Sequence, residues 1–103
     1  MDRFYTLLAL VEKWAEERGL FQNGTALGQA LKTIEEALEL AQAVNAGDRE
    51  KIVDAIGDVL VTIIIQARMQ GLSLIDCLEK AYSEIANRKG KVIGGQFVKE
   101  AKI

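Results

Sequence analysis

The sequence predicts an all-α protein in which four helices are followed by a short extended tail. Proline is absent from the 103 residues, apolar residues recur at helical spacing, and residues that commonly cap helices precede the apolar runs. Half of the residues are hydrophobic, which is ample for the core of one domain. We expect a single domain over residues 1–103, with helices at about residues 2–18, 25–46, 49–70 and 74–89 and the tail at residues 91–103.

The first helix is expected to begin after Asp2, an N-cap residue, and to end near Gly19. Its apolar residues recur at helical spacing. They are Phe4, Leu7, Leu8, Val11, Trp14 and Ala15. The segment Gln22-Asn23-Gly24 consists of turn-forming residues, so residues 20–24 are predicted to form a loop.

Cap residues also mark the next three helices. Thr25 is expected to cap the second helix, whose apolar face should be turned inward. That face consists of Leu27, Leu31, Ile34, Leu38, Ala41 and Val44. Gly47-Asp48 ends the second helix and caps the third, which closes at Gly71. Ser73 and Asp76 resemble a capping box at the start of the fourth helix.

The tail differs in character from the helices. Gly94-Gly95 separates two short β-prone runs, which favours a hairpin. An isolated hairpin is only marginally stable, so we expect the tail to dock on the helices or on a partner subunit. The third helix is nearly apolar on all sides, and a small monomer would struggle to cover it. A homodimer or homotetramer is therefore expected.

Two aspartates stand one helical turn apart inside the most apolar run of the chain, residues 52–65. The spacing of four places Asp54 and Asp58 on one helix face, where Thr62 and Gln66 follow. Because the surrounding residues are apolar enough for a core, we expect both carboxylates to be buried. A buried carboxylate without a partner is costly, so a metal ion or a basic side chain should face them.

A second acidic cluster lies one helix earlier. Glu35, Glu36 and Glu39 are three or four residues apart and therefore lie near one helix face. If the two helices pack antiparallel, their carboxylates converge on one place. Ligand sets made only of oxygen suit hard divalent cations, and Mg²⁺ or Mn²⁺ is the expected metal.

Each of these features also has a purely structural interpretation. The glutamates could form a solvated helix face, and the aspartates could be held by an internal salt bridge to Lys32 or Arg68. Lys32 stands one turn before Glu36, where it could screen the acids or contact a phosphate. Basic residues at the end of the fourth helix could simply complement the helix dipole.

The composition excludes several other classes of function. A net charge of −2 and a pI near 5.2 argue against binding to a nucleic-acid polymer. The complete absence of histidine excludes His-type zinc sites and His-based catalysis. The single cysteine, Cys77, cannot form an internal disulfide, so a cytoplasmic location is expected. No signal peptide is visible, and the longest apolar run is too short to span a bilayer.

The pattern of acidic residues in the two helices resembles that of a known family. Glu35-Glu36-Ala37-Leu38-Glu39 reproduces the Glu-Glu-x-x-Glu signature of MazG-like nucleoside triphosphate pyrophosphohydrolases, and Gly57-Asp58-Val59-Leu60 resembles their second signature. Residues 14–20 resemble the first helix of short members, and residues 81–91 with 97–100 resemble their C-terminal region. The similarity thus touches nearly the whole chain, and the order and separation of the motifs make it fairly specific.

The resemblance implies an all-α fold in which helix pairs from two subunits form each dimer core. It also implies Mg²⁺-dependent cleavage of an NTP or dNTP between the α- and β-phosphates, giving a monophosphate and pyrophosphate. The residues that match the family's metal ligands are Glu36, Glu39 and Asp58. Those that match a polar, basic stretch near the phosphates are Asn87, Arg88 and Lys89.

One departure from the family pattern bears on the metal site. The second signature usually carries Glu three residues before the aspartate, and here that position is Ala55. We expect Asp54, the nearest acid, to act as the substitute ligand. The alternatives are a site with fewer metal ions or a catalytically weak protein.

The leading hypothesis is a metal-assisted hydrolase in which Glu35 accepts a proton from the attacking water or orders the surroundings of the metal. The rival is a helical module of the same descent that binds a nucleotide or a protein without turnover, and Ala55 is its main support. Neither the preferred base nor the preferred sugar can be read from the sequence.

Overall fold

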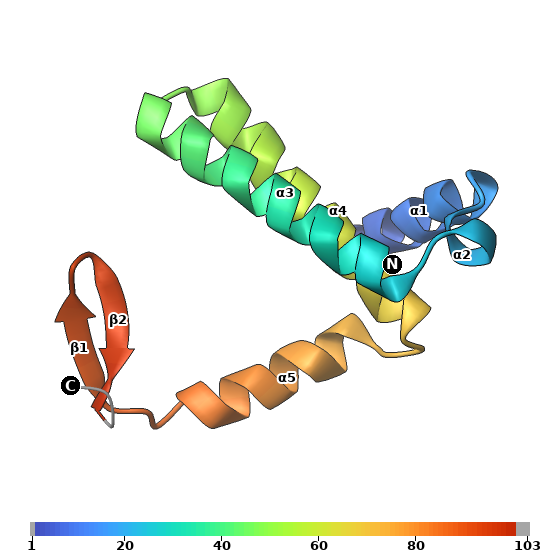
Figure 1. Ribbon diagram of the computed structural model, residues 1–103. Coiled ribbons are helices and arrows are strands. Elements are labelled where there is room, and N and C mark those ends of the chain that lie inside the picture. The colour runs from blue at the N-terminus through green and yellow to red at the C-terminus, as the bar shows by residue number, and fades with distance from the viewer. Residues whose placement is uncertain (1, 101–103) are drawn as a thin grey trace. The chain divides into compact units, whose positions relative to one another are not determined.

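The computed structural model describes residues 2–100 as two compact units, the first ending at Leu72 and the second beginning at Ser73. Figure 1 shows the helices and the one two-stranded sheet of this described part. The expected all-α character is confirmed for most of the chain. The expected number of helices is corrected from four to five among the described residues.

The first unit contains four helices, which are α1 (Arg3–Glu17), α2 (Leu20–Asn23), α3 (Ala26–Ala46) and α4 (Arg49–Met69). The expected caps are confirmed. Asp2 accepts a hydrogen bond from the backbone N–H of Phe4, Thr25 from that of Gly28, and Asp48 from that of Lys51. Gly47, at the end of α3, has a left-handed backbone with φ of +67°, as a glycine that ends a helix often does.

Helix α2 was not expected, because residues 20–24 were predicted to be a loop. Gly19 has φ of +75°, a conformation that glycine adopts without steric cost, and it turns the chain away from α1. The carbonyls of Gly19 and Leu20 then accept hydrogen bonds from the N–H groups of Asn23 and Gly24. The result is a single helical turn, too short to show a periodic apolar pattern.

Helices α3 and α4 pack side by side and antiparallel (Figure 1). Polar side chains bridge them. Gln66 donates to the carbonyl of Ala26 (2.9 Å), and Gln29 donates to the carbonyl of Thr62 (3.2 Å). The Thr33 hydroxyl lies 2.9 Å from that of Thr62. These contacts fix the register of the two helices, because each joins an early residue of α3 to a late residue of α4.

The inward face predicted for the second helix is wrong. Leu27, Ile34 and Leu38 are exposed, each by more than half, whereas Gln29 and Ala43 are buried. The contact between the helices uses small and polar side chains, which let the two backbones approach closely. The large apolar side chains of α3 consequently point away from α4, and α4 also exposes apolar residues, namely Val53, Ile56, Leu60 and Ile63.

The second unit consists of α5 (Leu74–Ile85) and a hairpin of β1 (Gly90–Ile93) and β2 (Gln96–Lys99). Ser73 caps α5 by accepting a hydrogen bond from the N–H of Asp76. The predicted hairpin is confirmed. Its strands are antiparallel, with Ile93 opposite Gln96, and the two glycines between them both have positive φ, as a tight hairpin turn requires.

The predicted end of the fourth helix at residue 89 is wrong, because α5 ends at Ile85. The chain then turns, with the N–H of Arg88 donating to the carbonyl of Ile85 (3.0 Å), and pairing with the second strand begins at Lys89, whose carbonyl accepts a hydrogen bond from the N–H of Glu100 (2.8 Å). Residues that join a β-pair cannot also continue a helix. The last three residues of the tail expected at 91–103 lie outside the described part.

Candidate functional site

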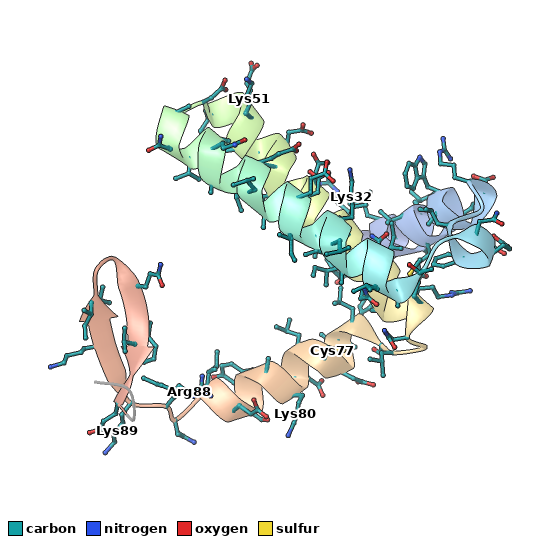
Figure 2. All side chains as sticks on the ribbon, viewed as in Figure 1. Lys32, Lys51, Cys77, Lys80, Arg88 and Lys89 are labelled. Carbon is teal, nitrogen blue, oxygen red and sulfur yellow. The ribbon has the colours of Figure 1, made fainter. Side chains whose placement is uncertain are left out.

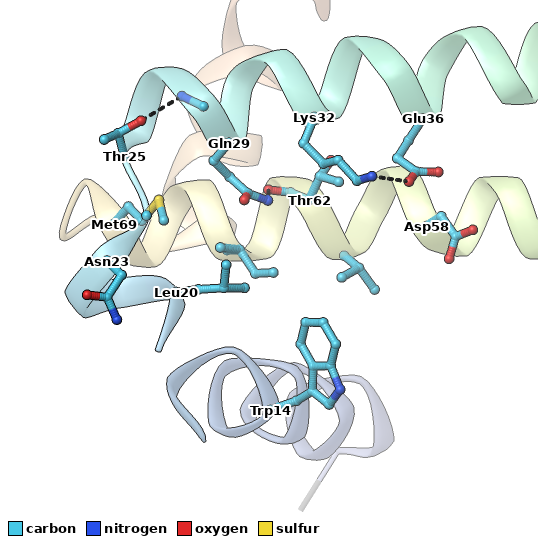
Figure 3. Close-up of a pocket in the computed structure, with 14 residues that line it drawn as sticks. Trp14, Leu20, Asn23, Thr25, Gln29, Lys32, Glu36, Asp58, Thr62 and Met69 are labelled. Atoms are coloured by element: carbon cyan, nitrogen blue, oxygen red, sulfur yellow. Dashed lines mark hydrogen bonds and ion pairs between the residues drawn. The ribbon is translucent and has the colours of Figure 1, made fainter. Parts of the chain in front are cut away.

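The acidic residues of α3 and α4 face one another where the two helices pack. Glu36 lies on α3 beside Asp58 on α4 (Figure 3). The Glu36 side chain is only 13% exposed, and its Oε2 atom is fully buried without a hydrogen-bond donor. Its Oε1 atom lies 3.5 Å from the Nζ atom of Lys32. A carboxylate oxygen buried in this way is costly, so the site is electrostatically incomplete on this side.

The charges of the neighbouring acids shift their titration. Burial raises the pKa of Asp58, and the charges of Asp54 and Glu36 raise it further, while Lys32 acts in the opposite direction. Hydrogen bonding to Glu36, followed by repulsion from its charge, raises the pKa of Glu39. The largest cause is burial for Asp58 and the hydrogen bond to Glu36 for Glu39. The neighbouring negative charges act in the same direction in both cases, because like charges disfavour the ionised form. Acids of both clusters therefore act on one another at Asp58, and the convergence of the full set on one metal site stays a prediction.

The prediction that both aspartates are buried is wrong for Asp54. Its side chain is exposed, whereas Asp58 is half-buried. Asp54 nevertheless faces the same cavity as Asp58 and Glu39, and its charge acts on the pKa of Asp58. Ala55 is buried, with 6% of its surface exposed, and also lines this cavity. Position 55 therefore faces the same cavity as the acids, although the methyl side chain of Ala55 cannot bind a cation.

The alternative of an internal salt bridge to the aspartates is wrong for the described residues. Lys32 contacts Glu35 (3.3 Å) and Glu36 rather than an aspartate, and its hydrogen bond to Glu35 raises the pKa of the ammonium group. Arg68 pairs with Glu12 (3.7 Å) and lies over the ring of Phe21. In the described part of the chain neither Asp54 nor Asp58 therefore forms a salt bridge, although the charge of Lys32 acts on the pKa of Asp58.

A cavity of about 620 Å³ opens on one side of the acids. Most of its wall is apolar, and Figure 3 shows the Trp14 indole projecting from α1 toward α4. The volume is within the range of small-molecule sites, which are typically lined by apolar and aromatic side chains with a few fixed polar groups. The lining residues are Trp14, Leu20, Asn23, Gly24, Thr25, Gly28, Gln29, Lys32, Glu36, Asp58, Val61, Thr62, Ile65 and Met69.

Gln29 is the fixed polar group of this cavity. It is 8% exposed, and its Nε2 atom donates to the carbonyl of Thr62. Because a carbonyl can only accept, the nitrogen end of the amide must face Thr62 and the oxygen end is the acceptor that remains. The hydroxyl of Thr62 is already engaged, since it donates to the carbonyl of Val59 (2.6 Å) and lies beside that of Thr33.

A second cavity, of about 480 Å³, opens on the other side of the acids. Its wall is more polar than that of the first cavity. It is lined by Glu39, Gln42, Ala43, Ala46, Lys51, Asp54, Ala55 and Asp58. Asp58 is the one residue that lines both cavities.

The carboxylate oxygens of this site meet only part of what a hard divalent cation requires. The buried, unpartnered Oε2 atom of Glu36 and the raised pKa values of Glu39 and Asp58 show a local excess of negative charge. In the side-chain arrangement of residues 2–100, however, no three acidic side chains lie close enough to hold one ion. Glu36 is turned toward Lys32 instead, so binding an ion would require carboxylate side chains to rotate.

The predicted substrate-binding residues fall in both units. Lys32 lies among the acids of the first unit. Asn87, Arg88 and Lys89 lie in the second unit, between α5 and β1, and Figure 2 shows Arg88 and Lys89 in this segment. Their contact with phosphate stays a prediction.

Sequence reasoning missed the remaining residues of the cavities, above all Gln29 and Lys51. Gln29 carried one usable signal, because a polar side chain four residues before Thr33 lies on the same helix face. Thr62 and Gln66 were placed on the stripe of the aspartates from their spacing, and their contacts with α3 confirm that placement. Lys51 carried no signal, since a lysine in the first turn of a helix is ordinary.

No described helix has both the length and the apolar character needed to cross a membrane. Comparison with curated proteins finds an uncharacterized 18.2 kDa protein from the rep-hol intergenic region of Haemophilus phage HP1 (strain HP1c1). It is 35% identical over 74 residues, which is 72% of this chain and 44% of the phage protein. The chain thus spans less than half of that relative.

No solved structure matches the chain. The family model of the MazG nucleotide pyrophosphohydrolase domain matches residues 22–93. This match includes both acidic clusters, α3, α4 and α5. The expected resemblance is confirmed, and the chain belongs to the MazG nucleotide pyrophosphohydrolase family.

Proposed function

We propose that the protein is a Mg²⁺-dependent pyrophosphohydrolase that converts an NTP or dNTP into the monophosphate and pyrophosphate. The observation that carries the proposal is the buried Oε2 atom of Glu36, unpartnered and beside Asp58, in a chain of this family. Lys32 pairs with Glu36, but no salt bridge holds the half-buried Asp58 among the described residues. A purely structural role would leave that carboxylate without a partner.

The metal ligands in this proposal are Glu36, Glu39, Asp54 and Asp58, and Mn²⁺ is a possible substitute for Mg²⁺. When bound, the cation would neutralise phosphate charge and favour attack by water. Glu35 is the proposed proton acceptor. Its side chain is 58% exposed and is held only by Lys32, so it can reach water without breaking a buried contact.

The chain's own cations and cavities would position the substrate. Lys32, now paired with two glutamates, would turn to the phosphates, and Asn87, Arg88 and Lys89 would supply further polar contacts. The nucleoside would occupy the 620 Å³ cavity, where the Trp14 ring offers a face for stacking. The oxygen of Gln29 would accept a hydrogen bond from the base.

Assembly as a homodimer or homotetramer belongs to the same proposal. The exposed apolar stripes of α3 and α4 support it, because a patch of this kind on a stable protein usually marks an interaction site. Light scattering should give a mass that is a multiple of 11.3 kDa. A well-folded monomer at micromolar concentration would contradict assembly. The single cysteine, Cys77, supports a cytoplasmic location.

The second candidate is a catalytically inactive module of the same family that binds nucleotide or protein, and the buried Ala55 favours it. A screen of the purified protein against the common NTPs and dNTPs, with Mg²⁺ and detection of pyrophosphate, separates the two. We expect steady pyrophosphate release from at least one nucleotide. Binding of Mg²⁺ and nucleotide without release would favour the inactive module.

A further inference from the structure

Trp14, the only tryptophan of the chain, is held incompletely by the walls of the cavities that it lines. It lines the 620 Å³ cavity and also a mostly apolar third cavity of about 430 Å³ between α1 and α4. The residue is nevertheless 44% exposed, so an indole in contact with these walls alone could turn about its side-chain torsions. Its orientation therefore depends on what covers the rest of the ring.

Arg18 covers one face of this ring. Its guanidinium carbon lies 4.5 Å from the centroid of the indole, which is within the range of a cation–π contact. Arg18 caps the end of α1, four residues after Trp14, and a side chain at a helix end leans over the turn that precedes it. Arg18 lines neither of the cavities that Trp14 lines, so the ring surface toward the cavities is left uncovered.

The polar contacts of the Arg18 side chain all go to Trp14 in the described part of the chain. Besides covering the ring, its Nη1 atom donates to the backbone carbonyl of Trp14 (3.4 Å). The guanidinium forms no salt bridge there, although two glutamates immediately precede it in the sequence. The bond to the carbonyl is sufficient for a role at the helix end. The contact with the ring is additional and indicates a role toward the indole.

We infer that Arg18 is a positioning residue, which holds the Trp14 indole so that its uncovered face stacks on the base of the substrate. This inference rests on the proposed function. The contact exists before a substrate binds, so it adds nothing directly to the free energy of binding. Instead it removes part of the cost of ordering the indole during binding. The gain in affinity is therefore limited by the strength of the contact itself.

The test uses the fluorescence of Trp14 in the full-length protein, which reports on this ring alone because the chain has one tryptophan. The variant is Arg18→Gln. Gln is a good helix former, and its amide can still donate to the backbone carbonyl of Trp14, so the end of α1 should be retained. In the absence of ligand, the decay of fluorescence anisotropy should show faster local motion of the indole in the variant than in the wild type.

The second measurement is a titration with the common nucleoside and deoxynucleoside monophosphates, each with Mg²⁺. Stacking of a base should change the Trp14 fluorescence of the wild type. For each monophosphate that binds, the Kd should rise about two- to fivefold in Arg18→Gln, which corresponds to the loss of an exposed cation–π contact.

The matched control is Lys13→Gln, which removes an exposed cation next to Trp14 that takes part in no ring contact or salt bridge among the described residues. It should change neither the motion of the indole nor any Kd. An indole that stays equally immobile in Arg18→Gln, an unchanged Kd in that variant, or equal effects of both variants would each overturn the inference. No fluorescence response of the wild type to any monophosphate would overturn it as well.

These results are separable from failure of the proposed function. If the wild type releases no pyrophosphate from any nucleotide but Arg18→Gln frees the indole and weakens binding of a monophosphate, hydrolysis fails and the role of Arg18 stands. If the wild type hydrolyses nucleotides and Arg18→Gln matches it in indole motion and Kd, the function stands and the role of Arg18 fails.

Discussion

The contact between α3 and α4 has two halves that differ in how completely their polar groups are paired. In the half near the start of α3, Gln29, Thr33, Thr62 and Gln66 all take part in hydrogen bonds between or within the helices. In the acidic half, Glu36 has a buried oxygen without a donor, and the pKa values of Glu39 and Asp58 are raised.

One half is therefore structural, and the other can take up a ligand. A polar network in which each side chain makes at least one hydrogen bond fixes the register of the helices. A cluster of carboxylates that raise each other's pKa gains free energy when a cation binds. The neutral half therefore holds the two helices in register, and the acidic half is stabilised when it binds a cation.

The largest effect is expected from Asp58→Asn in the acidic half. Loss of a proposed ligand should lower pyrophosphate release by more than about 100-fold, beyond the effect usual for residues outside the ligand set. Without metal, the same change should raise the melting temperature, because it removes one of the mutually repelling charges. Turnover and metal-free melting temperature are measured on the same preparation. A variant that is destabilised and retains activity would show that Asp58 is structural.

Asp54→Asn tests whether Asp54 replaces the acid absent at position 55. We expect activity to fall about 10- to 100-fold, with the fold retained because this side chain is exposed. Ala55 lines the same cavity, so the double variant Asp54→Asn/Ala55→Glu should recover part of the activity. Near-native activity of Asp54→Asn would refute the ligand role.

The neutral half is tested by Thr62→Val, which keeps the side-chain shape and removes the hydroxyl. Thr62 is 5% exposed, and loss of its bonds to Val59 and Thr33 should lower the free energy of unfolding by about 1 kcal/mol. Urea unfolding measures this change. The control is Thr6→Val, whose hydroxyl bond is exposed and should matter little. The folded Thr62→Val variant should hydrolyse nucleotide at nearly the wild-type rate. A large loss of activity would contradict the assignment of a purely structural role to the neutral half.

The smallest effect is a pH dependence of stability without metal. The folded pKa of Asp58 is raised above its ordinary 3.8, so the folded state binds the proton more tightly than the unfolded state. This group therefore costs stability as pH rises from 3.8 through the folded pKa. The difference in unfolding free energy, Asp58→Asn minus wild type, should be near zero below that window and positive above it. A constant difference across the window would contradict the assigned repulsion.

The local structure was largely predictable from sequence, because its signals are local. Asp2, Thr25, Asp48 and Ser73 cap the helices that they were expected to cap, and Gly94-Gly95 forms the expected turn. The end of α5 was misplaced, because strand pairing by Lys89 depends on Glu100, which is distant in sequence.

The packing face of α3 was predicted wrongly for a different physical reason. Apolar spacing shows that Leu27, Ile34 and Leu38 form one stripe, but the same stripe suits a core and an interface between subunits. Only the tertiary contacts show that Gln29 and Thr33 face α4. The acids of the candidate site could be predicted because their spacing and apolar surroundings are unusual. Gln29 and Lys51 could not, because the cavities exist only after the helices pack.

The most direct test of the incomplete acidic half is the melting temperature during a titration with Mg²⁺. The melting temperature of the wild type should rise by several degrees, because an ion that binds only the folded state at about 100 times its Kd adds about 2.7 kcal/mol to the free energy of unfolding. Asp58→Asn should start from a higher metal-free value and rise much less. A wild-type melting temperature that stays constant up to millimolar Mg²⁺, with and without nucleotide, would contradict the account.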